Sequence, residues 1–397
     1  MPGFELFGDA ERKEVNDVLE SGVLMRYGFD GARNGHWKAN ELEQELQDRL
    51  DVKHAQLTSS GTTALNVALA VLGVGAGDEV IMPTFTFVAS FESILASGAT
   101  PILVEIDDTL TLDPTAVEAA ITPNTKVVMP VHMCGSMADL DALKAICEKH
   151  DVYLLEDACQ AFAGTYKGKA LGSIGDVGCF SFDYVKTITC GEGGAMITNN
   201  DKFALHADHY SDHGHDHVGN DRGAESHPFI GYNFRISELN AAVGLAQIRR
   251  IDNFIAIQRK HKKVLKDALA TIPEVSFRRI PDEDGDSATF LSFFMSTAEL
   301  SSKVVTAFKE FGVDAYWNYY ENSWHYIKKW DHLKDMKTLF PVSDQIKKGM
   351  QDLNTTNFPQ SDDIISRNIS CLIKLSWTDA EVQERAEKMV AAIKSVV

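Results

Sequence analysis

A polar loop separates two apolar segments in Cys179-Phe-Ser-Phe-Asp-Tyr-Val-Lys-Thr-Ile-Thr-Cys-Gly-Glu-Gly-Gly-Ala-Met-Ile-Thr198. The loop contains one lysine, Lys186, and then glycine at 191, 193 and 194. Glycine lets the backbone approach a ligand closely, and lysine is the side chain that forms imines with carbonyl groups. The stretch therefore predicts a Schiff-base lysine at the floor of a cleft.

Strand and helix patterns alternate on the N-terminal side of this loop. Short apolar strands are expected near 54–58, 79–82, 101–106, 126–131 and 152–156, with helices near 63–72, 87–96, 117–121 and 140–149 between them. This βαβα order predicts an α/β fold, in which a mostly parallel sheet is covered by helices on both faces. Ligands of such sheets collect beyond the carboxyl ends of the strands. Ser60, Asp157 and Lys186 all follow strands, so we expect them to share one cleft.

Two motifs at strand ends have both a ligand-binding and a structural interpretation. Ser59-Ser-Gly-Thr62 opens a helix, where free amides and the helix dipole form an anion cradle, but the turn could also be a plain N-cap. Asp157, in Glu156-Asp-Ala-Cys-Gln160, could pair with a protonated pyridine nitrogen or cap a loop. An anion cradle, a carboxylate and a lysine at strand ends of one sheet together favour pyridoxal 5'-phosphate as the cofactor.

The composition narrows the range of partners. The chain has 397 residues and a net charge of −19, whereas duplex nucleic acid and anionic membranes both require basic patches. We expect neither as a partner. There is no run of about 18 apolar residues, no N-terminal signal pattern, and no Cys-x-x-Cys pair among the six cysteines. These features predict a cytoplasmic protein with reduced thiols.

The rest of the chain predicts a second domain. Helices are expected at residues 4–20, at 41 to about 50 with Asn40 as the cap, from about Ser237 to Leu269, and at 379–396. The long third helix has the length of a connector between domains. We expect an N-terminal segment plus a large cofactor-binding domain at 1–250, and a small C-terminal domain at 251–397.

Nucleotide and metal motifs are weak. Gly73-x-Gly75-x-Gly77 lacks the G-x-G-x-x-G spacing and no Walker sequence occurs, which disfavours a Rossmann dehydrogenase. Asp212-His-Gly-His-Asp-His217 contains three histidines, but metal sites need fixed ligands with supporting contacts, and this loop shows no such spacing. A mobile loop that contacts substrate is favoured over a metal site, and no metal is expected.

Several motifs together resemble those of the DegT/DnrJ group of pyridoxal phosphate-dependent sugar aminotransferases, over nearly the whole chain. They are Ser59–Thr62, Pro83-Thr-Phe-Thr-Phe-Val-Ala89, Leu155-Glu-Asp-Ala-Cys-Gln160, Gly175-Asp-Val-Gly-Cys-Phe-Ser-Phe182, Lys186 with Gly191-Glu-Gly-Gly194, and Gly231-Tyr-Asn-Phe-Arg235. The resemblance implies fold type I, as in aspartate aminotransferase, with a large mixed, mostly parallel sheet domain and a smaller C-terminal α/β domain. It also implies a homodimer with shared active sites.

The resemblance implies roles for individual residues. Lys186 would form the imine with the cofactor and carry the proton, and Asp157 would pair with the pyridine nitrogen. Relatives that remove a sugar hydroxyl carry histidine in place of this lysine, so Lys186 favours transamination. The other expected cofactor contacts are Ser60, Gly61, Thr62 and Ser181 at the phosphate, Phe87 on the ring face, Gln160 at the ring hydroxyl, and Asn233, which would reach the phosphate from the partner subunit.

A further set of motifs resembles the branch that aminates C8 of the oxidised sugar acid Kdo for bacterial lipopolysaccharide, with glutamate as donor. The motifs are His132-Met-Cys-Gly-Ser-Met137, Lys186-Thr-Ile-Thr-Cys-Gly191, Ser211-Asp-His-Gly-His-Asp-His217 and Asp221-Arg-Gly-Ala-Glu-Ser226. Cationic side chains suit an acidic sugar, and arginine binds carboxylates bidentately. The candidate substrate contacts are Arg26, Arg33, Lys38, His215, Arg222 and Arg235, although several could pair with local acids instead.

Two other functions stay open. An aminotransferase or dehydratase that acts on a nucleotide-linked 4-keto-sugar would use the same cofactor. A non-enzymatic binding or regulatory protein of the same fold need not retain the proton-transferring lysine. Lys186, Asp157 and Gln160 are all present, which disfavours that second alternative.

Overall fold

A computed structural model of the protein describes residues 3–219, 221–339 and 341–397, and its largest feature is a seven-stranded sheet. The strand order is β1-β9-β8-β5-β4-β2-β3. The bounds are β1 His54–Thr58, β2 Glu79–Pro83, β3 Thr100–Val104, β4 Thr125–Val128, β5 Tyr153–Asp157, β8 Val177–Ser181 and β9 Gly194–Thr198. The pairs from β8 to β3 are parallel, whereas β9 runs antiparallel to both of its neighbours. The predicted mixed, mostly parallel sheet is confirmed.

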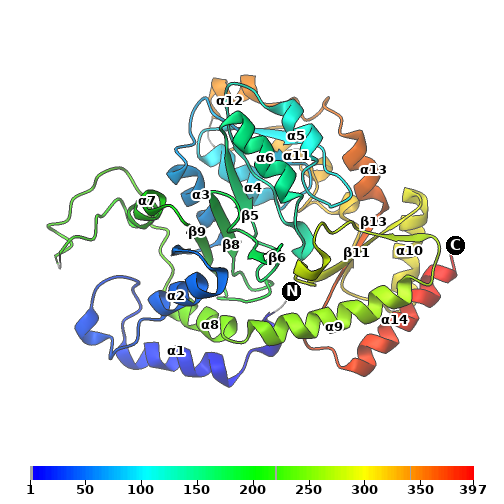
Figure 1. Ribbon diagram of the computed structural model, residues 1–397, viewed down its shortest axis with the longest axis horizontal. Helices are drawn as coiled ribbons and strands as arrows, with labels where there is room; N and C mark the ends of the chain where they lie inside the picture. The colour runs from blue at the N-terminus through cyan, green and yellow to red at the C-terminus, as the bar shows by residue number, and fades with distance from the viewer. Residues whose placement is uncertain (1–2, 220, 340) are drawn as a thin grey trace.

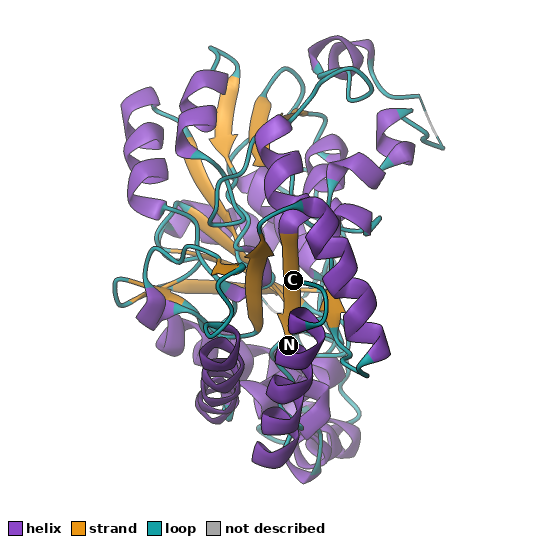
Figure 2. Cartoon of the chain, turned by 90° about the vertical axis from the view of Figure 1, so that its right-hand side faces the viewer, coloured by secondary structure: helices purple, strands orange, loops and turns teal. Residues whose placement is uncertain are grey.

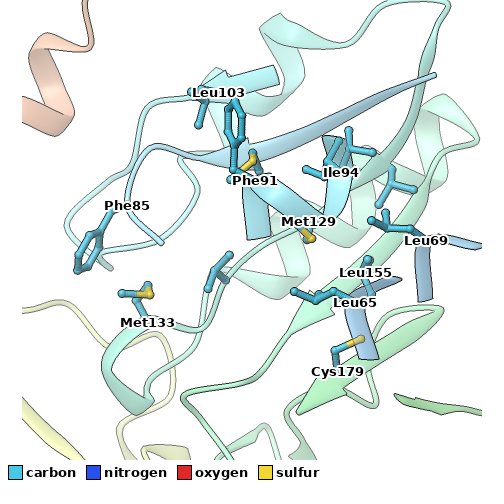
Figure 3. Packing of buried hydrophobic residues seen from close by; sticks show 14 of the residues in the cluster. Leu65, Leu69, Phe85, Phe91, Ile94, Leu103, Met129, Met133, Leu155 and Cys179 are labelled. Atoms are coloured by element: carbon cyan, nitrogen blue, oxygen red, sulfur yellow. The ribbon is translucent and has the colours of Figure 1, made fainter. Parts of the chain in front are cut away.

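Helices cover both faces of this sheet (Figures 1 and 2). Their bounds are α2 Lys38–Leu50, α3 Gly61–Val71, α4 Val88–Ala96, α5 Pro114–Ala120, α6 Leu140–His150, α7 Asp201–Ser211 and α8 Glu238–Ile248. Helices α3, α4 and α7 pack on one face, and α2, α5, α6 and α8 on the other. Figure 3 shows Leu65 of α3 and Ile94 of α4 near Met129 and Leu155 of the sheet. Because both faces are buried, the strands read as continuous apolar runs.

A second, antiparallel sheet has the order β10-β11-β13-β12. Its strands are β10 Val275–Phe277, β11 Phe290–Met295, β12 Tyr316–Trp317 and β13 Asn368–Leu372, and α9 Ile251–Leu269, α10 Ala298–Glu310 and α14 Asp379–Lys394 pack on it (right of Figure 1). All four strands lie beyond residue 250. However, Tyr326, Trp330 and Ile365 belong to the core of the large sheet. The division at residue 250 therefore stays a prediction.

The remaining elements are short. They are the hairpin of β6 Thr165–Tyr166 and β7 Lys169–Ala170, the helices α11 Asp331–Lys334, α12 Asp344–Gly349 and α13 Pro359–Arg367, and the 3-10 turns η1 Gly3–Leu6, η2 Asp30–Ala32, η3 Met133–Gly135, η4 Glu283–Gly285, η5 Tyr319–Glu321 and η6 Ile327–Lys329. Helix α1, Asp9–Ser21, begins later than predicted, because the chain first forms η1. The amide of Gly3 donates to the carbonyl of Lys186 (2.9 Å), so this N-terminal segment lies against the lysine loop.

The single helix predicted from Ser237 to Leu269 is wrong, because the chain forms two helices that break at Arg249 and Arg250. Arg250 forms an ion pair with Glu11, and Arg249 Nε donates to Glu45 (3.0 Å). The break directs both cations towards the N-terminal helices, while the apolar positions on either side of it stay buried. The apolar period continues across the break, which is why the sequence pattern did not reveal it.

Candidate active site

The carboxyl ends of β1, β5 and β8 meet at one edge of the large sheet. Gly194 of β9 pairs with Thr58 of β1 and with Ser181 of β8, and Asp157 ends the neighbouring β5. Because β9 reverses direction here, the loop that carries Lys186 starts and ends at this edge. The structure thus brings the turn after β1, the aspartate and the lysine loop to one place.

The turn after β1 is both a helix cap and a tight approach to β8. The Ser60 hydroxyl accepts the Thr63 amide (3.1 Å), so the N-cap interpretation is correct for this side chain. A Cβ added at Gly61 would lie 2.7 Å from Ser181 Cβ, so only glycine fits there. Within the described residues, the amides of Gly61 and Thr62 donate no hydrogen bond. Two free amides at a helix N-terminus beside a serine hydroxyl fit a phosphate group.

Asp157 is a buried carboxylate that is surrounded by neutral donors. Its side chain accepts from the Ser90 hydroxyl (2.8 Å) and from the Cys159 amide (3.2 Å), and the residue is 3% exposed. Among the residues that the structure describes, no lysine, arginine or histidine nitrogen lies within 4.0 Å of it. A buried charge needs a partner. This donor set fits a cationic ring nitrogen as the missing partner of Asp157.

The preceding residue, Glu156, is buried completely and holds the strand end in place. It accepts from His132 Nε2 (2.9 Å) and from the amides of Gly172 (2.8 Å), Ile174 (2.7 Å) and Gly175 (2.7 Å). Burial raises the pKa of the Glu156 carboxyl, but these donors outweigh burial and lower the pKa below its usual value. The network fixes the backbone on which Asp157 stands.

Lys186 lies in a turn that its own amide closes by donating to the carbonyl of Asp183 (3.1 Å). Its charge acts on two partly buried groups, Cys159 and His325. Burial and then Asp157 raise the pKa of the Cys159 thiol, and Lys186 opposes that rise. Burial and then Lys186 lower the pKa of His325 to about 3. The charge of Lys186 therefore opposes that of Asp157 at Cys159 and favours the neutral form of His325.

Gln160 and Phe87 flank the same edge. Gln160 is buried, and its Oε1 accepts from the amide of Cys134 (3.1 Å). Phe87 is 39% exposed, and its ring centroid lies 5.6 Å from that of His325 and 6.4 Å from that of Trp324. An exposed aromatic face beside buried polar groups suits a planar ring as its partner.

The sequence did not predict two residues of this site. Ser90, which donates to Asp157, looks like any polar position of helix α4, although it follows the Pro83–Ala89 motif directly. His325 lies in a segment without a strand or helix pattern, and contacts with a remote segment bring it to the edge, among them that of its carbonyl with the Thr86 amide (2.9 Å). No local signal could have found His325.

Residues 212–219 and 221–235, which we call the arm, extend from the end of α7 (left of Figure 1). Asp212 is fully buried in the arm, and its carboxylate accepts from Arg222 Nη2 (3.0 Å), His217 Nε2 (3.0 Å) and Arg235 Nη1. Burial raises the pKa of Asp212, but these donors outweigh it and hold the pKa far below its usual value. Two predicted substrate contacts, Arg222 and Arg235, therefore meet on one carboxylate.

His217 ties the arm to the N-terminal segment. Its Nδ1 lies 2.7 Å from Asp208 Oδ2, and its ring centroid lies 4.2 Å from that of Tyr27. The Tyr27 hydroxyl also donates to Asp208 (2.8 Å). Burial alone lowers the pKa of His217, but hydrogen bonds to Asp208 and Asp212 outweigh burial and raise the pKa to about 9. His217 is thus a cation at neutral pH.

The remaining predicted residues of the arm differ in exposure. His215 Nδ1 lies 2.8 Å from Glu225 Oε2 inside the arm. Asn233 is exposed and forms a bridge with Asp212 at the base of the arm. Its neighbour Ile230 is 85% exposed. An exposed amide beside an exposed apolar side chain is available to a partner subunit, and the predicted phosphate contact of Asn233 stays a prediction.

Arg26 and Arg33 are buried and engaged within the N-terminal segment. Arg26 donates to both carboxylate oxygens of Glu43, and Arg33 Nη1 lies 3.4 Å from Glu238 Oε2. Arg33 also donates to the carbonyl of Met25 (2.6 Å). The alternative of pairing with local acids describes both arginines in this structure, and their contact with substrate stays a prediction.

Two further observations concern metals and membranes. Across residues 3–219, 221–339 and 341–397, no group of three or more histidine, cysteine, aspartate or glutamate side chains is arranged to hold a metal ion. Both ring nitrogens of His217 already contact carboxylates. Within the same ranges, no helix combines the length and the apolar character that crossing a membrane requires.

The mixed sheet, the lysine between β8 and β9 and the buried aspartate at the end of β5 define the class of fold type I, pyridoxal phosphate-dependent aminotransferases. Comparison with known proteins identifies the group within that class. The chain belongs to the DegT/DnrJ/EryC1/StrS aminotransferase family, whose sequence profile matches residues 7–366. The predicted family, fold class and enzyme class are confirmed.

Individual relatives show how far the similarity extends. The chain is 32% identical to a GDP-perosamine synthase from Vibrio cholerae over 376 residues, which cover 91% of this chain and 95% of that enzyme. It is 42% identical to a GDP-perosamine synthase from Caulobacter vibrioides over 221 residues, 55% of this chain and 58% of that one. Its structure matches that of an aminotransferase from Psychrobacter cryohalolentis, with a TM-score of 0.84, 25% identity and 98% coverage of both chains.

The family depends on pyridoxal phosphate, which confirms the predicted cofactor. The residues at the sheet edge fit it, since neutral donors leave Asp157 without a cation, two amides at α3 are free, and the loop that carries Lys186 starts and ends at the same edge. When bound, the cofactor supplies an electron sink for the substrate's Cα bond. The contacts of Ser60, Gly61, Thr62, Phe87, Gln160, Ser181 and Asn233 with the cofactor remain predictions.

Proposed function

We propose that the protein transfers the amino group of L-glutamate to the C8 aldehyde of 8-oxo-Kdo, giving 8-amino-3,8-dideoxy-manno-octulosonate for lipopolysaccharide. A cluster of cations in the arm carries this proposal. Three cations, His217, Arg222 and Arg235, share the two carboxylates of Asp208 and Asp212. Within this cluster there is one more cation than carboxylate, and Arg222 Nη1 is buried without a hydrogen-bond partner in the described structure. Both features suit an acceptor that carries a carboxylate.

The residues at the sheet edge support the chemistry of the proposal. Lys186, once released from the cofactor, would take the proton from the donor's Cα and return it in the second half-reaction. Asp157 would hold a proton on the ring nitrogen, because a buried carboxylate favours a cationic partner. Phe87 would cover one face of the ring, and its exposure supports that role.

We also propose that the enzyme works as a cytoplasmic homodimer with shared active sites. The exposed apolar side chains of the arm, Val218, Ile230 and Tyr232, are 73%, 85% and 53% exposed, which supports a second copy as their cover. Asn233 stands among them. Six unpaired cysteines, five of them buried, are consistent with a reducing compartment.

A nucleotide-linked 4-keto-sugar is the second candidate acceptor. The identity to GDP-perosamine synthases over nearly the whole chain favours it. Such an acceptor would place its charge on a diphosphate away from the reacting carbon. The two candidate acceptors therefore differ in the group that the cations of the arm would bind, which is a carboxylate in one and a diphosphate in the other.

A spectral half-reaction separates the candidates. The enzyme is first converted to its amine form with L-glutamate, and is then mixed with 8-oxo-Kdo or with GDP- and UDP-linked 4-keto-sugars. We expect 8-oxo-Kdo alone to restore the visible band of the aldehyde form at micromolar to millimolar concentration. Return of the band only with a nucleotide-linked sugar would contradict the Kdo proposal and leave the aminotransferase assignment intact.

A further inference from the structure

The turn η3 lies between the second sheet and a residue of the active site. On one side, the amide of Cys134 donates to Gln160 Oε1 (3.1 Å). On the other side, Arg278 Nη1 donates to the carbonyl of Met133 (2.6 Å), and the Ser287 hydroxyl donates to the carbonyl of Gly135 (2.7 Å). The turn and both of these donors are buried, so each bond is shielded from water.

The bond from Cys134 orients the side-chain amide of Gln160. A glutamine amide has one oxygen acceptor and one NH2 donor group. Since the oxygen takes the Cys134 amide, the NH2 group is left as the donor, and it makes no hydrogen bond within the described residues. Gln160 follows Asp157 by three residues and is 6% exposed. The turn therefore determines which end of Gln160 faces a ligand.

The turn has an unusual conformation and little room to move. Cys134 and Gly135 have φ angles of 56° and 76°, both in the left-handed region. A Cβ added at Gly135 would lie 1.9 Å from Thr289 Oγ1, so the second sheet's loop presses directly on the turn. A non-glycine residue in this region is strained and persists only where surrounding contacts require it. Arg278 and Ser287 supply those contacts.

Arg278 itself has no other evident task. It follows β10, is 6% exposed, and its Nε and Nη2 lack hydrogen-bond partners in the described structure. Burying a guanidinium that makes only one hydrogen bond costs free energy. We therefore expect its contact with Met133 to have a functional role. Its neighbour Arg279 is different, because its half-exposed side chain pairs with Asp107 and Asp108.

We propose that Arg278 is a positioning residue, which acts through η3 to hold the Gln160 amide with its donor towards the hydroxyl oxygen of the cofactor ring. The inference rests on the proposed contact of Gln160. In the lysine-bound form, that ring oxygen would also accept a hydrogen bond from the protonated imine nitrogen. A second donor weakens that internal hydrogen bond, so it lowers the pH at which the imine nitrogen loses its proton. Loss of the second donor raises this pH.

The test is a pH titration of the visible absorption band of the holoenzyme. Gln160→Ala and Arg278→Met are each expected to raise the midpoint by about 0.5–1 pH unit, the equivalent of one hydrogen bond. The double variant should shift no further than Gln160→Ala alone, because both changes remove one contact. Arg279→Met, which cuts the neighbouring link to the large sheet, is the matched control and should leave the midpoint unchanged.

Each outcome has one meaning. Additive shifts in the double variant, or equal shifts in Arg278→Met and Arg279→Met, would overturn the proposal, since Arg278 would then act independently of Gln160. An unchanged midpoint in Gln160→Ala would show that the contact on which the proposal rests does not exist, whatever the acceptor sugar is.

Should Arg278→Met not fold, Ser287→Ala removes the hydroxyl bond to the same turn and should shift the midpoint in the same direction. In the cofactor-free protein, either variant should speed amide exchange in residues 132–136 several-fold.

Discussion

Two buried aspartates mark two regions that work in opposite ways. Asp157 is 3% exposed and accepts only neutral donors, from Ser90 and Cys159. Asp212 is fully buried and accepts from three cationic side chains of the arm. The first carboxylate lacks a countercharge within the described chain, whereas the second has more than it needs.

The difference suggests that the region of Asp157 serves the chemistry and the region of Asp212 serves the choice of acceptor. An unbalanced buried carboxylate is costly until a cation arrives, so the region around Asp157 is built for a bound cofactor. The carboxylate of Asp212 already has cationic partners and needs no ligand to balance its charge. Under the proposed function, the cations around it would contact the acceptor. Changes at the first region should therefore abolish turnover, and changes at the second should alter which acceptor is used.

Lys186→Ala should have the largest effect. Removal of the amine that carries the proton should lower turnover by on the order of 10²–10⁴-fold or more, and the visible band of the lysine-bound cofactor should disappear. The measurement is steady-state transamination together with an absorption spectrum. Lys53→Ala, at a lysine with a 64% exposed side chain, is the control and should be normal. Normal turnover of Lys186→Ala would refute the role of this lysine.

Glu156→Gln tests the support beneath Asp157. The variant removes the charge that four buried donors share and should destabilise the protein by about 3–5 kcal/mol, measured by urea unfolding. The exposed-site control Glu118→Gln should cost no more than about 0.5 kcal/mol. Because the folded pKa of Glu156 is lowered, its contribution is present above the unfolded value of 4.5 and is lost as the pH falls below it. An acid-unfolding profile that does not differ between Glu156→Gln and the parent would contradict this.

Arg222→Ala should have a smaller and more selective effect at the arm. If Arg222 meets the acceptor's carboxylate, KM for the acidic sugar should rise about tenfold with little change in kcat. The half-reaction with glutamate should be unaffected, since it precedes acceptor binding. Arg367→Ala, at the end of helix α13 and outside the arm, is the control and should leave this KM unchanged. Equal losses in both half-reactions would show that Arg222 supports the fold rather than the acceptor.

His217 should give the smallest effect, visible only at alkaline pH. Its folded pKa is raised to about 9, so its stabilising contribution is complete below its unfolded pKa near 6.5 and is lost as the pH rises through 9. Limited proteolysis of the arm should accelerate about fivefold between pH 7.5 and 10, because the loss of one hydrogen bond costs about 1 kcal/mol. His217→Gln should remove this pH dependence. A flat profile in the parent protein would disprove the ionic tie.

The sequence predicted the large sheet and the edge that carries the candidate active site because both have local sequence patterns. The buried strands are apolar segments, Asp157 ends one of them, and Ser60 and Lys186 lie in the loops that follow two others. Residues that reach this edge from distant parts of the sequence have no such pattern. His325 reaches the edge through a backbone bond to Thr86, and no period or spacing announces that contact.

Charged residues were harder to interpret from sequence. Arg26 and Arg33 were candidates for substrate binding, yet their side chains are buried against Glu43 and Glu238. The choice between an acid in the same chain and a ligand depends on distances between remote segments. The break at Arg249 was missed because apolar positions continue on both sides of it and no local helix-breaking residue marks it.

The reversal of β9 has a consequence for heat resistance. The turn after β1, the end of β5 and the two ends of the β8–β9 loop would all contact one small molecule, although the turn and the end of that loop lie far apart in the chain. The cofactor would then act as a reversible cross-link between four sheet segments. Ligand binding to the folded state alone adds about 2.7 kcal/mol at a concentration 100 times Kd. The cofactor-free enzyme should therefore melt at a lower temperature, and should open first along β1, β9 and β8.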